Sequence, residues 1–142
     1  MEIRTAAVGD LGGILQADHL ASHGDAERAE LLRHCLNLGE VQVQVDHGSV
    51  TGFVIRKPGY FFGRDFIELL MVDPRHRRSG TGRALLQAAV RSAGTDQVFT
   101  STNASNVAMR SLLVSEGWSF SGKLDGLDEG DPELVYFTRG DA

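Results

Sequence analysis

Apolar and polar positions alternate most regularly in residues 40–45, EVQVQV, where the valines occupy every second position. This spacing is typical of a half-buried strand, because successive side chains of a strand point to opposite faces. The polar residues 46–49 follow, and a second strand-like run occupies residues 50–56. The pattern therefore predicts a β-hairpin.

Helical spacing marks the segments before this hairpin. Residues 8–22 predict a first helix, with Asp10 as its N-terminal cap. Residues 25–39 predict a second helix, and Gly39 is its expected stop. Residues 1–6 alternate only briefly and predict an edge strand.

The second half of the chain alternates between strand-like and helix-like runs. Residues 65–72, DFIELLMV, are apolar on both faces, as expected for a strand deep in a sheet. Further along the chain, helices are predicted at residues 81–94 and 103–117, and strands at residues 96–102, 118–124 and 133–139. This order predicts a single mixed α/β (α+β) domain over residues 1–142, without a linker.

Composition narrows the class of protein. The 142 residues are 42% hydrophobic and carry a formal net charge of −5, and an acidic total argues against nonspecific nucleic-acid binding. No apolar stretch approaches the roughly 20 residues that cross a bilayer, and the N-terminus lacks the pattern of a secretion signal. The single cysteine, Cys35, excludes an internal disulfide and a cysteine zinc site. We therefore expect a cytoplasmic protein without a membrane partner, a nucleic-acid partner or a metal.

The charges are unevenly distributed along the chain. Residues 75–95 hold five arginines and no acid, whereas residues 125–133 hold five acids and no base. One cationic and one anionic segment point to an anionic and a cationic ligand. The alternative is that both segments are solvated surface.

The arginine-rich segment has the order of a phosphate site. A strand leads through a glycine-bearing loop into a helix, whose first N–H groups have no internal partner. Gly80 and Gly82 allow the backbone to approach an anion, and nearby arginines neutralise its charge. The Lys-Ser/Thr pair of a nucleotide P-loop is absent, and Leu85 occupies the place of the last Gly or Ala of a dinucleotide fingerprint. The spacing present is Arg77-x-x-Gly80-x-Gly82.

Residues 72–86, VDPRHRRSGTGRALL, resemble the acetyl-CoA-binding motif of the GCN5-related N-acetyltransferases, the GNAT superfamily. A second block resembles the same family, because Asn106 opens a helix and Gly117 and Trp118 start the next strand. The resemblance covers nearly the whole chain. It implies a mixed central sheet of about six to seven strands, splayed between strands 4 and 5 and flanked by about four helices.

The resemblance also implies acetyl-CoA as co-substrate and assigns residues to it. The backbone of the fourth strand would pair with the pantetheine arm, Asn106 would face the cofactor, and the loop would hold the pyrophosphate. The cofactor-binding residues so assigned are Leu70, Met71, Val72, Arg77, Arg78, Ser79, Gly80, Thr81, Gly82, Arg83 and Asn106. For Arg83 the alternative is a solvated side chain in the first helical turn.

Glu68 is the candidate catalytic base. It is the one charge in residues 66–72, and burial of an unpaired carboxylate is costly, so we expect a fixed partner or a chemical task. Some members of the resembling family that acetylate polyamines carry Glu at this strand position. The alternative is a structural carboxylate that pairs with Arg56, Arg64 or a backbone N–H.

The chain departs from the family at one position. Leu113 stands where many members carry a tyrosine that protonates the leaving thiolate, and leucine donates no proton. The remaining candidates for this acid are Ser111, Ser115, Tyr136 and water. The alternative is that the thiolate leaves without an acid.

The resemblance implies an N-acetyltransferase that transfers the acetyl group directly to a primary amine. Acids near the expected acceptor regions, such as Asp25, Glu27 and Glu30, favour a small cationic molecule: a polyamine, an amino sugar or an amino acid derivative. The alternatives are an acetyltransferase for protein or peptide amines and a noncatalytic acyl-CoA-binding module. A nucleotide-binding regulator is a further rival. Homodimers are common in the resembling family.

Overall fold

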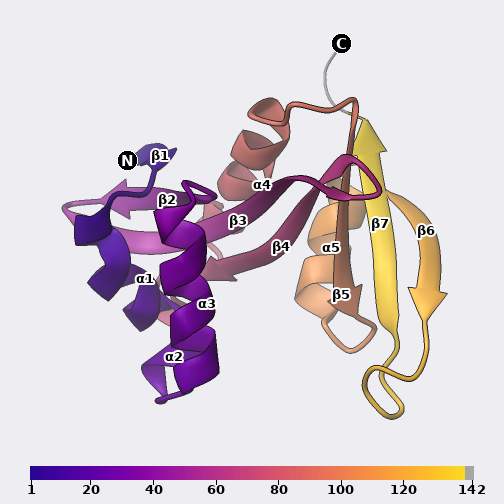
Figure 1. Ribbon diagram of the computed structural model, residues 1–142, viewed down its shortest axis with the longest axis horizontal. Helices are drawn as coiled ribbons and strands as arrows, with labels where there is room; N and C mark the ends of the chain where they lie inside the picture. The colour runs from indigo at the N-terminus through magenta and orange to yellow at the C-terminus, as the bar shows by residue number, and fades with distance from the viewer. Residues whose placement is uncertain (140–142) are drawn as a thin grey trace. The chain divides into compact units, whose positions relative to one another are not determined.

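The computed structural model describes residues 1–139, and within them a seven-stranded sheet is hydrogen-bonded in the order β1-β2-β3-β4-β5-β7-β6 (Figure 1). The strands are β1 (Glu2–Thr5), β2 (Val41–Asp46), β3 (Ser49–Phe61), β4 (Arg64–Val72), β5 (Gln97–Asn103), β6 (Ser119–Leu124) and β7 (Glu133–Arg139). The helices are α1 (Leu11–Ala17), α2 (His19–Ser22), α3 (Ala26–Asn37), α4 (Thr81–Arg91) and α5 (Val107–Ser115), with 3₁₀ turns at Val8–Asp10 and Pro74–His76. Because β4 pairs with β5 in parallel and the other recorded pairs are antiparallel, the predicted mixed sheet is confirmed.

The chain forms two compact units, and β3 and β4 contribute residues to both. The first unit comprises Met1–Arg56 and Leu69–Ala89. The second comprises Lys57–Glu68 and the chain from Val90 onward. The prediction of one domain over residues 1–142 stays a prediction, and residues 140–142 lie outside the described part of the chain.

The first unit is built around the predicted hairpin. β2 and β3 pair antiparallel, and His47 and Gly48 turn the chain with φ of 50° and 76°, the paired positive values that a tight hairpin turn requires. The alternating valines of β2 face the core, as predicted. The buried residues of this core are Ile14, Ala17, Leu32, Cys35, Leu36, Val41, Val43, Phe53 and Ile55.

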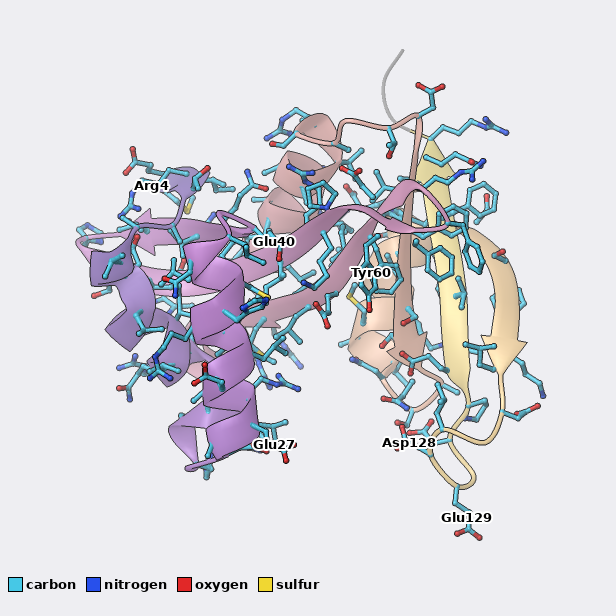
Figure 2. All side chains as sticks on the ribbon, viewed as in Figure 1. Arg4, Glu27, Glu40, Tyr60, Asp128 and Glu129 are labelled. Atoms are coloured by element: carbon cyan, nitrogen blue, oxygen red, sulfur yellow. The ribbon has the colours of Figure 1, made fainter. Side chains whose placement is uncertain are left out.

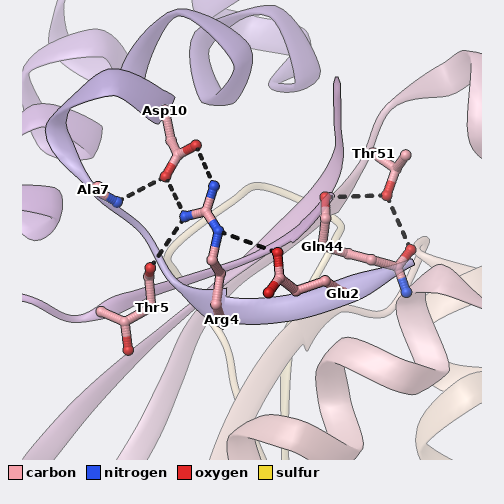
Figure 3. A network of polar contacts seen from close by, with 7 residues as sticks. All are labelled: Glu2, Arg4, Thr5, Ala7, Asp10, Gln44 and Thr51. Atoms are coloured by element: carbon pink, nitrogen blue, oxygen red, sulfur yellow. Dashed lines mark hydrogen bonds and ion pairs between the residues drawn. The ribbon is translucent and has the colours of Figure 1, made fainter. Parts of the chain in front are cut away.

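The predicted first helix is wrong in two respects. The carboxylate of Asp10 does not cap α1; it accepts two hydrogen bonds from the Arg4 guanidinium at 2.7 and 3.0 Å and one from the Ala7 N–H at 2.7 Å (Figure 3). The helix is also split at Asp18, whose extended backbone ends α1 and whose side chain caps α2 by accepting from the Ala21 N–H. The described residues therefore hold five helices instead of about four.

The second predicted helix is confirmed as α3. The carboxylate of Asp25 accepts from the Arg28 N–H at 2.9 Å and caps its first turn. Gly39 follows its end with φ of 73°, and its N–H donates to the carbonyl of Leu36. Such a left-handed residue is the usual stop signal of a helix.

β3 is longer than the sequence predicts. The predicted strand stops at Arg56, before Lys57-Pro58-Gly59, but the observed strand continues to Phe61 and returns as β4 after Phe62 and Gly63. The N–H of Gly59, at φ of 64°, donates to the carboxylate of Asp65 at 3.1 Å. A proline and a left-handed glycine are accommodated here because this stretch is exposed and Asp65 supplies the missing acceptor.

The second unit contains β5, β6, β7 and the first part of β4. One face of this sheet is buried, including Val98, Thr100, Leu134 and Tyr136. On the opposite face four phenylalanine rings form a row, and the centroids of neighbouring rings are 5.0–5.5 Å apart. In order along the row they are Phe66, Phe61, Phe99 and Phe137.

The ladder between β4 and β5 is short. It joins Asp65, Phe66 and Ile67 to Val98, Phe99 and Thr100, whereas β4 continues to Val72. The recorded pairing between β4 and β5 thus ends at Ile67.

Candidate active site

A buried aspartate fixes the start of the arginine-rich loop in the first unit. The Asp73 carboxylate accepts from the N–H of Arg75 at 2.9 Å and from its guanidinium at 2.8 and 3.1 Å. These bonds lower the pKa of Asp73 and outweigh the opposing effect of its burial. The Asp73 N–H donates to the Thr51 carbonyl at 2.9 Å, which ties the loop to β3.

Two left-handed residues bend the loop before α4. Arg78 has φ of 65° and Gly80 has φ of 83°. The first helical hydrogen bond runs from the Ala84 N–H to the Gly80 carbonyl at 3.0 Å. Helix α4 itself therefore offers no acceptor to the N–H groups of Thr81 and Gly82, which are the donors that an anion at a helix N-terminus uses.

The side chains of Ser79 and Thr81 close the loop from within. The Ser79 hydroxyl donates to the His76 carbonyl, and its oxygen lies 2.9 Å from that of the buried Thr81. The loop amides and hydroxyls are thus organised by the loop's own sequence.

The close approach of β3, β4 and α4 depends on Gly52. A Cβ at this position would lie 2.8 Å from the Met71 carbonyl oxygen and 3.0 Å from atoms of Thr81 and Leu85. Only a residue without a side chain fits there, so Gly52 holds the end of β4 against the beginning of the helix.

The predicted cofactor residues of the first unit come together in this arrangement. Leu70, Met71 and Val72 end β4, and residues 77–83 follow after Asp73 and the 3₁₀ turn Pro74–His76. The side chains of Leu69 and Met71 pack against the core of the unit. Which of these residues contact a cofactor stays a prediction.

The loop has the properties that a diphosphate requires. Arg77, Arg78 and Arg83 are exposed. Arg75 is exposed as well, and its guanidinium pairs with Asp73. The space around Gly80 is open: a Cβ at this position would have no atom within 4 Å apart from those of the flanking residues. The buried Nδ1 of His76 lacks a hydrogen-bond partner within the described residues. Cationic side chains, unused amides and an unpaired ring nitrogen together fit a phosphorylated ligand.

Glu68 lies in the second unit and has an ion-pair partner that the sequence analysis missed. Its Oε2 is 3.6 Å from Nζ of Lys57, and the exposed fractions of the two side chains are 30% and 15%. None of the recorded contacts of Glu68 involves the proposed partners Arg56 and Arg64, and Arg64 donates to the Phe62 carbonyl instead. Lys57 precedes Pro58 and Gly59, which signal a turn, so no pattern marked it as part of a strand beside β4.

Asn106 caps α5, also in the second unit. Its Oδ1 accepts from the Met109 N–H at 3.1 Å. Asn106 thus opens the helix, as the resemblance implies, and its contact with a cofactor stays a prediction.

The candidates for the acid lie around α5. Leu113 is fully buried, whereas Ser111, Ser115 and Tyr136 line one open groove with a volume of about 460 Å³. The Ser115 hydroxyl donates to the Leu112 carbonyl at 2.9 Å. The groove brings three of the proposed donors together without selecting one.

Three acids of the late loop have structural partners. Asp128 accepts from the Asn103 amide at 2.9 Å, the Asp131 carboxylate accepts from the hydroxyl of Ser105 at 2.6 Å, and Glu133 accepts from the hydroxyl of Ser101 at 2.8 Å. Figure 2 shows Glu129 pointing away from the chain at the tip of this loop. Asp128, Asp131 and Glu133 therefore fix the loop to β5 and to the residues that follow β5.

Residues 1–139 hold neither of two further classes of feature, a metal site and a membrane-spanning helix. No group of three or more His, Cys, Asp or Glu residues there has the arrangement of a metal site. No helix in the same range has the length and apolarity needed to span a bilayer.

Known structures resemble this chain over its whole length. An acetyltransferase of the GNAT family from Bacillus cereus ATCC 10987 is 30% identical, with a TM-score of 0.91 over 99% of this chain and 98% of that one. The yncA protein of Salmonella typhimurium, solved with its cofactor acetyl-CoA, is 22% identical, with a TM-score of 0.78 over 100% and 95% of the two chains. A ribosomal-protein-alanine N-acetyltransferase from Brucella melitensis is 23% identical, with a TM-score of 0.77 over 98% and 99%.

The family model gives the same result from the sequence. The model of the acetyltransferase (GNAT) family matches residues 10–117, which include β4, the arginine-rich loop and α5. A comparison with curated proteins gives no match. The fold, the loop before α4 and the family match together show that this chain belongs to the GNAT family of acetyltransferases.

Proposed function

We propose that the protein transfers the acetyl group of acetyl-CoA directly to a primary amine. The observation that carries this proposal is the loop before α4, where exposed arginines, an open left-handed glycine and unused helix amides meet in a member of an acetyltransferase family. The structure of yncA with acetyl-CoA supports the choice of co-substrate.

In this proposal the first unit binds the co-substrate. The amides of Thr81 and Gly82 and the guanidinium groups of Arg77 and Arg78 hold the diphosphate. The backbone at the end of β4 pairs with the pantetheine arm as an added strand would. These groups bind and orient, and none of them forms a covalent bond to the acyl group.

Glu68 removes a proton from the acceptor amine, directly or through water. The neutral nitrogen then attacks the thioester carbonyl carbon, the C–S bond breaks, and the thiolate takes up a proton. Because no covalent enzyme intermediate is needed, the absence of a serine or cysteine triad among the predicted site residues is no obstacle. Ser111, Ser115, Tyr136 and water remain the candidate donors to the thiolate.

We propose a small amine that is cationic in solution as the acceptor. The exposed carboxylate of Glu27, in α3, is available to attract such a molecule. The acids of the late loop support a cationic acceptor less than their number suggests, because three of them accept hydrogen bonds from Asn103, Ser105 and Ser101. An amine of a protein or peptide is the second candidate, and the resemblance to the Brucella melitensis enzyme favours it. The cytoplasmic location and the homodimer stay predictions.

The test is a panel of amines with detection of the released CoA thiol. Polyamines, amino sugars, amino acids and peptides cover the proposed classes. Glu68→Gln should lower kcat/KM about 10²-fold or more, the effect of losing a positioned base, and leave the affinity for acetyl-CoA nearly unchanged. Glu2→Gln removes an exposed carboxylate of β1 that pairs with Arg4 and has no proposed role, and it serves as control.

Two results would contradict the proposal. If the protein binds acetyl-CoA but no amine releases thiol, the noncatalytic module is the better description. If ATP or NAD raises the melting temperature more than acetyl-CoA does, the loop serves a nucleotide instead, because a ligand stabilises the state that binds it.

A further inference from the structure

The chain contains only two lysines among its fourteen basic residues, and one of them lies beside the candidate base. Lys57 places Nζ 3.6 Å from Oε2 of Glu68, and both residues belong to the second unit. The other lysine, Lys123, lies in β6, and its Nζ is 3.9 Å from a carboxylate oxygen of Asp125. The two amines therefore offer a comparison within one molecule.

The surroundings of Lys57 hold its amine in place. Its side chain is 15% exposed, and Nζ lies 5.6 Å from the ring centroid of Tyr60, which is labelled in Figure 2. The paired Oε2 of Glu68 is buried and has no hydrogen-bond partner within the described residues. Among the described residues, the ion pair recorded for this carboxylate is with a primary amine.

The surroundings of Lys123 are different. Its side chain is 57% exposed, and the side chain of Asp125 is 72% exposed. Solvent screens such a pair and leaves the amine mobile. Acetyl-CoA that reacts from bulk solution, without help from the protein, should modify Lys123 faster than the half-buried Lys57.

We propose that Lys57 is a self-acetylation site, modified by the protein's own active site when no external amine is present. This inference rests on the proposed function, because it gives Lys57 the place of the acceptor amine beside Glu68. Glu68 takes a proton from the Lys57 ammonium, and the neutral Nζ attacks the thioester carbonyl carbon of acetyl-CoA. The C–S bond breaks as an amide bond forms at Nζ. Nζ gives up its second proton in this step, the thiolate takes up a proton, and CoA leaves as the thiol.

The reaction proceeds within one molecule. Because the amine lies 3.6 Å from the base in the same chain, the reaction needs acetyl-CoA but no encounter with a second protein molecule. The rate constant of Lys57 acetylation is therefore independent of protein concentration. The product loses the ion pair with Glu68 and the cation–π contact with Tyr60.

The experiment incubates the pure full-length protein with acetyl-CoA alone and follows each lysine by peptide mass spectrometry. The bond after Lys57 is Lys-Pro, which trypsin leaves intact, so residues 57–64 give the same peptide before and after modification. We expect Lys57 to be acetylated at least about tenfold faster than Lys123. We expect Glu68→Gln to slow Lys57 at least about tenfold, the low end for loss of a positioned base, and to leave Lys123 unchanged.

Lys57→Arg is the matched control, because arginine keeps the cation beside Glu68 and does not accept the acetyl group. Its intact mass should gain no acetyl group within the time that modifies the wild type. Circular dichroism establishes that each variant is folded. Should Glu68→Gln fail to fold, the wild-type ratio of Lys57 to Lys123 and the Lys57→Arg result decide.

Two outcomes separate this inference from the proposed function. If external amines are acetylated while Lys57 stays unmodified, or reacts no faster than Lys123, the inference is wrong and the proposed function stands. If acetyl-CoA neither binds nor acetylates any external amine, the proposed function fails. Acetylation of Lys57 that Glu68→Gln leaves unchanged also overturns the inference.

Discussion

Individual carboxylates in this chain work by holding arginine side chains. Asp10 binds the guanidinium of Arg4, and Asp73 binds that of Arg75. In each case the arginine lowers the pKa of the aspartate, most strongly through side-chain hydrogen bonds. The Asp73 pair also removes Arg75 from the set of cations that a ligand can use, so this contact shapes both the loop and its charge.

The first prediction concerns the pH dependence of this contact. A carboxyl whose pKa is lower in the folded chain stabilises the fold above its unfolded value, near 3.9, and this contribution is lost as the pH falls through the folded value. Asp73→Asn keeps an oxygen acceptor but loses the charge, so we expect a loss of about 1 kcal/mol at pH 7. Urea unfolding should show this difference shrinking below pH 4. A difference that stays constant from pH 7 to pH 3 would contradict the assignment.

The partners of single residues were the least predictable part of the sequence. Asp10 has the residue type and position of a helix cap, yet its carboxylate is taken by Arg4, which lies in β1. Glu68 was expected to need a partner, and the partner proved to be Lys57 instead of Arg56 or Arg64. A local pattern identifies a group that needs a contact, but the contact depends on which strands lie side by side.

At the scale of elements, a glycine determines how closely β3, β4 and α4 approach. A Cβ on Gly52 would lie within 3.0 Å of the Met71 carbonyl oxygen, which is part of the backbone and cannot turn aside. Gly122, in β6, is also a strand glycine, but no atom lies within 4 Å of its built Cβ. The two glycines differ in how much room a side chain would have, and not in residue type.

The second prediction compares these two glycines. We expect Gly52→Ala to destabilise the fold by about 1–3 kcal/mol, the usual effect of overpacking, and to weaken acetyl-CoA binding because the end of β4 must move from α4. Gly122→Ala should leave binding unchanged and the stability within about 1 kcal/mol of the wild type. Thermal unfolding and calorimetry measure both effects. Equal losses in the two variants would show that close packing at Gly52 has no special role.

Elements with strong local signals were predicted well. The β2–β3 hairpin, α3 with its stop at Gly39, and α4 after the glycine loop agree with the structure. The extension of β3 to Phe61 was missed because Lys57-Pro58-Gly59 signals a turn. There the N–H of Gly59 donates to the carboxylate of Asp65 across the β3–β4 turn, and the ring of Phe61 packs on Phe66 and on Phe99, which is distant in sequence. No local pattern marks these contacts.

At the scale of the whole molecule, the net charge conceals a local reversal. The chain carries −5, yet Arg77, Arg78 and Arg83 are exposed on one short segment. The family and the candidate cofactor loop were predictable because the arginines of this segment and its glycines lie close together in the sequence. The acceptor was less predictable, because acids that suggested a cationic ligand proved to bind Asn103, Ser105 and Ser101 within their own unit.

The last prediction concerns the stability of the molecule with its co-substrate. At a concentration about 100 times its Kd, acetyl-CoA should stabilise the fold by about 2.7 kcal/mol, which corresponds to a rise in Tm of roughly 5–10 °C for a chain of this length. Since exposed arginines contribute much of the attraction, the rise should shrink as salt is increased from about 0.05 to 0.5 M. The double charge reversal Arg77→Glu and Arg78→Glu should abolish most of it and most of its dependence on salt. A rise in Tm that neither salt nor the reversal alters would mean that acetyl-CoA binds elsewhere on the protein.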